Sequence, residues 1–175
     1  FDGPKVDVEN TLVYHSGIHA LLVLKGAEFT FNHCNFMGYG AGDPTTPAVG
    51  IRNYFVDQFG TLTIASVPSG NFNNCVIDGY GDEQLVFDTL PGATLNFDFN
   101  KSVIKATASS HSMFTTCIFN QPVYFIAPYQ GNFKFSNTAS ALSNSADAAF
   151  LTSDNKDIED NLRSNPTDIG VYEIP

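Results

Sequence analysis

An internal repeat constrains the fold of this chain more than any other feature of its sequence. Residues 31–40 (FNHCNFMGYG) return as residues 72–81 (FNNCVIDGYG), each position 41 residues later. A shorter third copy, residues 99–104 (FNKSVI), keeps the Phe, the Asn and the final apolar residue and has Ser102 in place of the cysteine. A fourth similar segment, residues 114–119 (FTTCIF), follows only 15 residues after the third. That spacing is too short for another full turn of the same kind, so we expect this segment on a different strand.

Short apolar strands broken at glycine precede each copy. They occupy residues 20–24 and 28–31, then 53–57 and 61–64, then 85–88 and 94–97. One unit therefore consists of a strand, a glycine turn, a second strand, an asparagine corner and a third strand. Three short strands cannot bury their inner face alone, so the units must stack along an axis and pair like strand with like strand. The sequence predicts an all-β protein, a parallel β-helix.

Alternation along the strands assigns the interior, because successive side chains point to opposite faces. The inward set expected from this rule is Phe29, Phe31, Cys34, Phe36, Leu62, Ile64, Cys75, Ile77, Leu95, Phe97 and Ile104. The phenylalanines would stack from coil to coil, and Asn32, Asn73 and Asn100 would form a polar ladder at the corner. Three cysteines do not suggest a disulfide framework, so we expect Cys34, Cys75 and Cys117 to be free, with Cys34, Cys75 and Ser102 in one inward stack.

Composition supports this class and excludes others. The 175 residues suit one domain, and the net charge of -10 excludes nucleic acid as an expected partner. No apolar run approaches the ~18 residues that a membrane span requires. The chain starts at Phe1 without Met, which favours a piece of a longer protein, whose N-terminal part would then be a further partner.

The residues carry a resemblance to a known family. The pattern of strand, glycine turn, strand and N-x-C-x-[FI] resembles the secreted right-handed parallel β-helix proteins of the pectate-lyase-like superfold. The tail is similar to the closing segment of bacterial cell-envelope members, which ends in P-D-I-G-A-Y-E, where this chain has residues 166–173 (PTDIGVYE). Asn161 and Val171 depart from that pattern, at a usual Gly and a usual Ala. The resemblance implies a right-handed, single-stranded solenoid and an extracellular or cell-surface location.

The expected organisation has two parts. Residues 1–139 form the coils, the C-terminal part of a longer β-helix, and residues 140–175 form an irregular cap packed on them, because the strand pattern fades there. Arg163 and Asp168 are expected to tie this cap down.

Acidic residues around the second Gly-Tyr-Gly loop are the candidate metal site. Enzymes of the resembled superfold cleave acidic polysaccharides with a Ca²⁺ held by carboxylates and an Arg or Lys base. The weak candidates here are Asp78, Asp82 and Glu83, with Asp88 further along and Lys101 and Lys105 as the nearest bases. Sequence spacing does not require them to converge, so we expect solvated acids, no catalytic residue and no cofactor, with Ca²⁺ left open.

Other catalytic arrangements are not apparent. The histidines, His15, His19, His33 and His111, lack metal-ligand spacing and are expected at the surface or at corners, and no G-x-S-x-G motif occurs.

Tyr39 and Tyr80 are the candidate glycan-binding residues. Both lie between glycines at equivalent positions of the repeat, so they should leave the coil at one edge, where flat aromatic rings can stack on sugars. The alternative is that each ring packs on its own loop.

Two functions follow from these expectations. The first is a non-catalytic β-helix module of a bacterial surface or secreted protein, either a scaffold or a binder of polysaccharide. The second is the C-terminal part of a polysaccharide lyase or hydrolase whose active site lies in preceding N-terminal coils, a view supported by the fold alone. Clustered carboxylates in a groove would favour the second, and paired aromatics the first.

Overall fold

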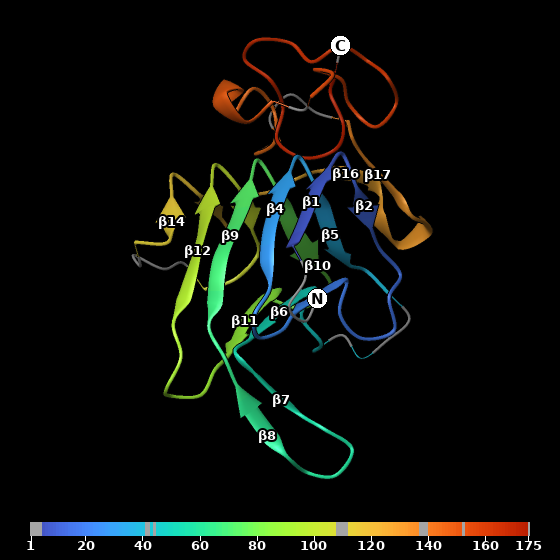
Figure 1. Cartoon of the computed structure of the whole chain (residues 1–175). Coiled ribbons are helices and arrows are strands. Elements are labelled where there is room, and N and C mark those ends of the chain that lie inside the picture. The colour runs from blue at the N-terminus through green and yellow to red at the C-terminus, as the bar shows by residue number, and fades with distance from the viewer. Residues whose placement is uncertain are drawn as a thin grey trace.

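Three sheets of parallel strands organise the molecule (Figure 1). The computed structural model describes residues 5–40, 43, 45–107, 112–136, 140–151 and 153–174. Within them the protein is nearly all β. The first sheet, sheet A, contains β1 (Lys5–Glu9), β4 (Glu28–Asn32), β9 (Val67–Asn73), β12 (Leu95–Asn100) and β14 (Phe114–Thr115) in that spatial order.

The other two parallel sheets take their strands from the same successive passes of the chain. Sheet B contains β2 (Leu12–Val13), β5 (Asn35–Gly38), β10 (Val76–Gly79), β13 (Val103–Ile104) and β15 (Ile118–Phe119). Sheet C contains β3 (Leu21–Val23), β6 (Val49–Arg52) and β11 (Leu85–Asp88). Each pass crosses sheet A, turns a corner and crosses sheet B, and the first three passes then add a strand to sheet C.

The predicted phenylalanine column lies in the core. Phe31 pairs with Phe72, and Phe72 pairs with Phe99, across parallel strands. The rings of Phe72 and Phe99 are stacked, with centroids 4.4 Å apart and planes 6° apart. Cys34, Cys75 and Ser102 are all buried beside them, and the three cysteines of the chain are free. The repeat therefore identifies the interior correctly at these positions.

The asparagine ladder is also confirmed. The Asn73 side-chain amide donates to Asn32 Oδ1 at 2.8 Å, and the Asn100 amide donates to Asn73 Oδ1 at 2.8 Å. The residue after each ladder position turns the corner in the left-handed backbone region. The five corner residues have φ between 46° and 53°: Asn10, His33, Asn74, Lys101 and Thr116. Each pass thus changes direction with one residue.

Residues 61–64 do not form a strand of the parallel sheets, contrary to the expectation from alternation. The strands β7 (Tyr54–Val56) and β8 (Leu62–Ile64) pair antiparallel as a hairpin that projects from the sheets (Figure 1). Leu62 and Ile64 are consequently 49% and 37% exposed. The Asp57 carboxylate accepts from the backbone amides of Phe59 and Thr61 and closes the turn locally, while β9 takes the place in sheet A.

Phe114 was also misplaced by the spacing argument. Phe114 pairs with Phe99 and continues the same column, with ring centroids 5.1 Å apart. The expectation of a different strand failed because a pass need not have constant length. No described residue between β13 and β14 joins sheet C, so this pass closes within 15 residues.

Sheet B is covered on both faces. Its inward residues join the main core, and its outward residues Met37, Val76 and Val103 are buried in a second apolar cluster. The cover comes from the hairpin of β16 (Phe125–Ala127) and β17 (Asn132–Phe135), which the 3₁₀ turn η1 (Pro128–Gln130) connects, and from the C-terminal tail. Phe133 and Ile169 are fully buried in this cluster. The continuous apolar runs of sheet B reflect this double burial.

The tail, residues 140–174, lies across the corners between sheets A and B (Figure 1). Its described residues add no strand to the three sheets and include one 3₁₀ turn, η2 (Ala148–Phe150). The Gly170 amide donates to the Asn74 carbonyl at 2.8 Å, and His33 Nδ1 lies 3.1 Å from the Gly170 carbonyl oxygen. His33 is therefore a corner residue as expected, but it is buried and not at the surface.

Arg163 is the central anchor of the tail. Its guanidinium donates to Asn10 Oδ1 at 2.8 Å and to the Gly170 carbonyl at 3.0 Å. It also lies 3.6 Å from the buried carboxylate of Glu173. Asp168 Oδ2 accepts from the Ile174 amide at 2.8 Å, which closes the last turn. Arg163 thus ties the tail to the corner at Asn10 as expected, whereas the Asp168 carboxylate holds the tail together from within, through the amides of Asn144 and Ile174.

Candidate functional site

The two Gly-Tyr-Gly loops lie side by side where sheet B ends. Gly38 pairs with Gly79, and the Tyr80 amide donates to the Gly38 carbonyl at 3.3 Å. The buried carboxamide of Gln84 explains the glycines. Its Oε1 would lie 2.1 Å from a Cβ at Gly38 and 2.2 Å from a Cβ at Gly79. Its amide nitrogen donates to the Gly81 carbonyl at 3.0 Å, so Gln84 fixes the direction in which both loops leave the sheet.

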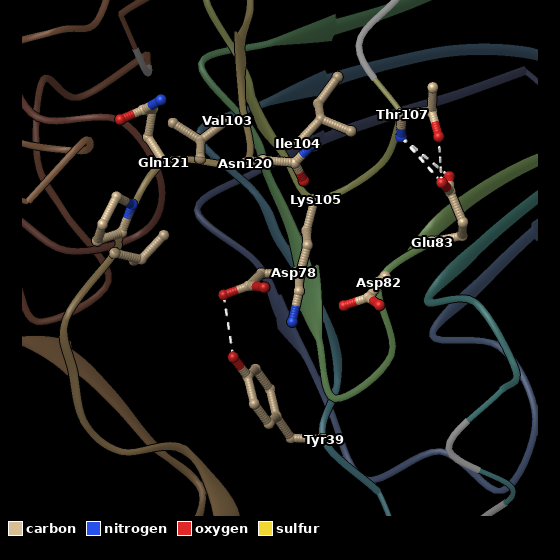
Figure 2. A pocket seen from close by; sticks show the side chains of 12 residues that line it. Tyr39, Asp78, Asp82, Glu83, Val103, Ile104, Lys105, Thr107, Asn120 and Gln121 are labelled. Carbon is tan, nitrogen blue, oxygen red and sulfur yellow. Dashed lines mark hydrogen bonds between the residues drawn. The ribbon is translucent and has the colours of Figure 1, made fainter.

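A pocket of about 490 Å³ opens beside these loops (Figure 2). We call it the acid pocket, because its lining includes Asp78, Asp82 and Glu83. Lys105 from the next pass lines it as well, together with Tyr39. The structure therefore brings Asp78, Asp82 and Glu83 together with one of the two candidate bases, Lys105. Sequence spacing alone did not require this.

Asp78 is the buried polar group of the acid pocket, with only 8% of its surface exposed. Its Oδ2 accepts from the Tyr39 hydroxyl at 3.0 Å, and its Oδ1 accepts from the Gly79 amide at 2.8 Å. Burial raises the pKa of Asp78, while these two hydrogen bonds and the nearby Lys105 charge oppose that rise. Burial, and then the adjacent Asp78, raise the pKa of Tyr39 as well, so its hydroxyl stays protonated as the donor.

The remaining charged groups of the acid pocket are held differently. The Lys105 ammonium donates to the Gly79 carbonyl at 2.9 Å and to the Tyr80 carbonyl at 3.4 Å. Glu83 accepts from the side chain and the backbone amide of Thr107, which lower its pKa. Asp82 is exposed, and no described residue gives it a hydrogen bond or an ion pair.

A second pocket of about 280 Å³ adjoins the first at the ring of Tyr39. We call it the tyrosine pocket, because Tyr39, Tyr80 and Tyr129 line it. The Tyr129 ring meets Tyr39 edge-on at 5.4 Å between centroids and lies 6.2 Å from Tyr80. Tyr39 is half-buried against Phe133, whereas Tyr80 and Tyr129 are 59% and 66% exposed.

Sequence reasoning located Tyr39 and Tyr80 but not Tyr129. The repeat places the first two at one edge, as the paired glycines show. Tyr129 arrives from η1 at the tip of the hairpin that covers sheet B, in an element outside the repeat. The sequence signal that could have located Tyr129 is the turn sequence Pro128-Tyr129-Gln130-Gly131. In the structure Gly131 takes the left-handed conformation that ends this turn, and the Tyr129 ring is exposed at the hairpin tip.

Five other candidates lie elsewhere or outside the described residues. Asp88 pairs with Arg52 at 2.8 Å on sheet C, away from both pockets. Lys101 turns a corner and lines neither pocket. His15 and His19 lie at the surface, where His19 Nδ1 is 2.8 Å from the Pro47 carbonyl, and His111 lies outside the described residues.

The calcium hypothesis does not fit the geometry of these acids. Within the described part of the chain, no group of three or more His, Cys, Asp or Glu side chains is placed to hold a metal ion. Asp78 is occupied by Tyr39 and Gly79, and Glu83 is directed to Thr107. The three carboxylates share a pocket without converging on one point.

The comparisons with known proteins leave the chain without an assigned family. No family model matches it, and neither the curated proteins nor the solved structures gave a match. Over the described residues, no helix is both long and apolar enough to cross a membrane.

Proposed function

We propose that the parallel sheets close into a right-handed parallel β-helix. Support comes from the strand order, since each pass adds neighbouring strands to sheet A and sheet B in the same register. Parallel strands joined through a crossover are right-handed in nearly all proteins. A crystal structure tests this, and either a left-handed path or a sandwich of separate sheets would overturn it.

We further propose that the chain is a non-catalytic, glycan-binding module of a secreted or cell-surface protein. The observation that carries this proposal is the pair of adjoining pockets around Tyr39. One is walled by tyrosine rings, and the other is lined by charged and amide side chains together with apolar ones. Exposed rings supply flat apolar faces for sugar rings, and the neighbouring carboxylates and amides can accept or donate hydrogen bonds to hydroxyls. Two pockets that share the Tyr39 side chain can take neighbouring sugars of one oligosaccharide.

Calorimetric titration with a panel of oligosaccharides tests this function. Tyr80→Ala and Tyr129→Ala should each weaken binding about fivefold, since one aromatic contact contributes roughly 1 kcal/mol. Phe59→Ala is the matched control, because Phe59 is 83% exposed on the projecting hairpin and lines neither pocket. Binding that survives both tyrosine substitutions, or no binding to any member of the panel, would reject the proposal.

Polysaccharide cleavage is a second candidate, because Asp78, Asp82, Glu83 and Lys105 share one pocket. A buried carboxyl with a raised pKa is a usual proton donor, and a lysine beside it is a usual base. Assays for new reducing ends and for unsaturated products decide between the two functions. Products that disappear in Asp78→Asn would replace the binding function with an enzymatic one.

A further inference from the structure

The two pockets together, which we call the groove, carry a strong excess of negative charge. The acid pocket has three acidic side chains, of which Asp82 and Glu83 are exposed and Asp78 is buried, against one ammonium, Lys105. The described lining of the tyrosine pocket adds the carboxylate of Asp43 and no cationic side chain. The whole chain carries a formal charge of -10, which has the same sign as this excess. A ligand that enters the groove therefore meets a negative potential.

Lys105, the single cationic side chain in the described lining of the groove, forms its hydrogen bonds with backbone carbonyls of the protein. Lys105 donates to the carbonyls of Gly79 and Tyr80 and makes no ion pair of 4.0 Å or less with a described carboxylate. Asp82, by contrast, is exposed and receives no hydrogen bond from the described residues. Figure 2 shows the Asp82 carboxylate pointing toward the side of the pocket where the Lys105 side chain ends. Asp82 is thus the group with free acceptor capacity.

The exposed rings of Tyr80 and Tyr129 also favour a positively charged ligand. A tyrosine face carries negative quadrupole density and attracts a cation placed above it. Tyr80 and Tyr129 are exposed rings of the tyrosine pocket, which also holds Asp43, while Asp78, Asp82 and Glu83 line the acid pocket that shares Tyr39 with it. The rings and the carboxylates therefore favour the same kind of ligand, a sugar that carries an ammonium group. A uronate would instead meet like charge.

We infer that the groove binds a glycan that bears free, protonated amino groups, such as a β-1,4-linked glucosamine oligomer. This inference rests on the proposed glycan-binding function and names the class of sugar. The amino group would lie near Asp82, and the sugar rings would lie against Tyr80 and Tyr129. N-acetylation keeps the sugar backbone but removes the charge, so it should remove the preference.

The test compares the glucosamine tetrasaccharide with its fully N-acetylated counterpart by calorimetry at pH 5.5 in low and in high salt. We expect the amine form to bind at least about fivefold tighter in low salt and to lose that advantage in high salt. Asp82→Asn should weaken the amine form about threefold to fivefold and leave the acetylated form unchanged, as befits a partly exposed charge pair. Asp98→Asn, an exposed acid on the outer face of sheet A, is the matched control and should change neither.

The outcomes separate this inference from the proposed function. Equal binding of both tetrasaccharides, weakened by Tyr80→Ala, would overturn the amine preference and leave the glycan-binding function standing. An Asp82→Asn effect as small as that of Asp98→Asn would also overturn it. No binding of either tetrasaccharide would overturn the amine preference, and the oligosaccharide panel would then decide the glycan-binding function by itself.

Discussion

At the scale of single residues, a few polar side chains determine where the chain turns: the stacked asparagines hold the corners, and the Gln84 carboxamide lies between the two Gly-Tyr-Gly loops. Asn32, Asn73 and Asn100 recur at fixed places in the repeat, so their ladder could be anticipated before any coordinates. Gln84 has no counterpart in the other copies of the repeat. Nothing in the sequence indicates that its carboxamide occupies the space left by Gly38 and Gly79. Asp82 and Asp78 could be named, but their shared pocket depends on where Gln84 directs the loops.

The middle of the asparagine ladder should be sensitive to truncation. Asn73→Ala removes two side-chain hydrogen bonds and leaves Asn32 and Asn100 each without a partner at a partly buried corner. We expect a loss of about 2 kcal/mol in the free energy of unfolding, measured by urea denaturation. Asn71→Ala, two residues earlier on β9 and outside the ladder, should change it by less than about 0.5 kcal/mol. Equal effects would show that the ladder contributes nothing specific.

Thr116 offers a stabilising substitution. It turns its corner with φ of 53°, a backbone conformation that is unfavourable for a β-branched residue, whereas Asn74 occupies the equivalent corner with the same φ. Thr116→Asn should therefore raise the free energy of unfolding by about 0.5 to 1 kcal/mol, visible as a higher denaturation midpoint. Thr63→Asn, at an exposed extended position of the projecting hairpin, should give no such gain.

His33 should make stability fall in mild acid. Burial, and then the charge of Arg163, lower the pKa of His33 from 6.5 to about 3. Between these values the unfolded chain binds a proton that the folded chain does not, so the stability that the neutral ring provides above pH 6.5 is lost as the pH falls toward 3. From pH 7 to pH 5 this amounts to about 2 kcal/mol.

The pH test compares the wild type with His33→Asn, since Asn accepts the left-handed corner conformation. The variant should be less stable at pH 7 but should lose less stability on going to pH 5. Parallel pH profiles of the two proteins would contradict the assignment.

At the scale of whole elements, alternation predicts that a strand exists but not which strand it pairs with. Residues 61–64 alternate as a coil strand would, yet they form one arm of the antiparallel β7–β8 hairpin. The deciding contacts are local, at Asp57 and the turn, and they compete with distant pairing that sequence alone does not reveal. The parallel strands of sheets A and B were recoverable because the repeat supplied their partners.

The projecting hairpin should be removable. The Ala65 amide donates to the Asn53 carbonyl at 3.0 Å, so the ends of the excursion already lie together. Replacing residues 54–64 with a short glycine turn should change the free energy of unfolding by no more than about 1 kcal/mol. It should also reduce self-association in light scattering, because it removes exposed Phe55, Val56 and Phe59. A collapse of the thermal transition would show that the hairpin is integral to the coils.

The tail should depend on its buried charge pair. Arg163→Met leaves the carboxylate of Glu173 buried without its cation and removes the bond to Asn10. We expect a loss of about 3 kcal/mol or more in the free energy of unfolding, and faster proteolysis of the tail. The double variant with Glu173→Gln should recover part of that loss. A double variant as unstable as the sum of the two single ones would contradict the coupling.

At the scale of the whole molecule, an all-β architecture with parallel sheets was predictable because the repeat forces units to stack. The lengths of the passes were not. Members of the inner column are separated by 41 residues between Phe31 and Phe72 but by 15 between Phe99 and Phe114. Loop length is set by local turns and not by the pattern that defines the core, which is why the groove, built from loops and one hairpin tip, required the structure.

That unequal spacing has an evolutionary consequence. The column from Val8 through Phe31, Phe72 and Phe99 to Phe114 keeps its register whatever length of chain joins its members. Insertions and deletions between strands therefore leave the inner neighbours of every ring in place. Surface loops of such a protein can lengthen, shorten and acquire new ligands by drift, while selection on the interior continues to act on a handful of unchanging positions.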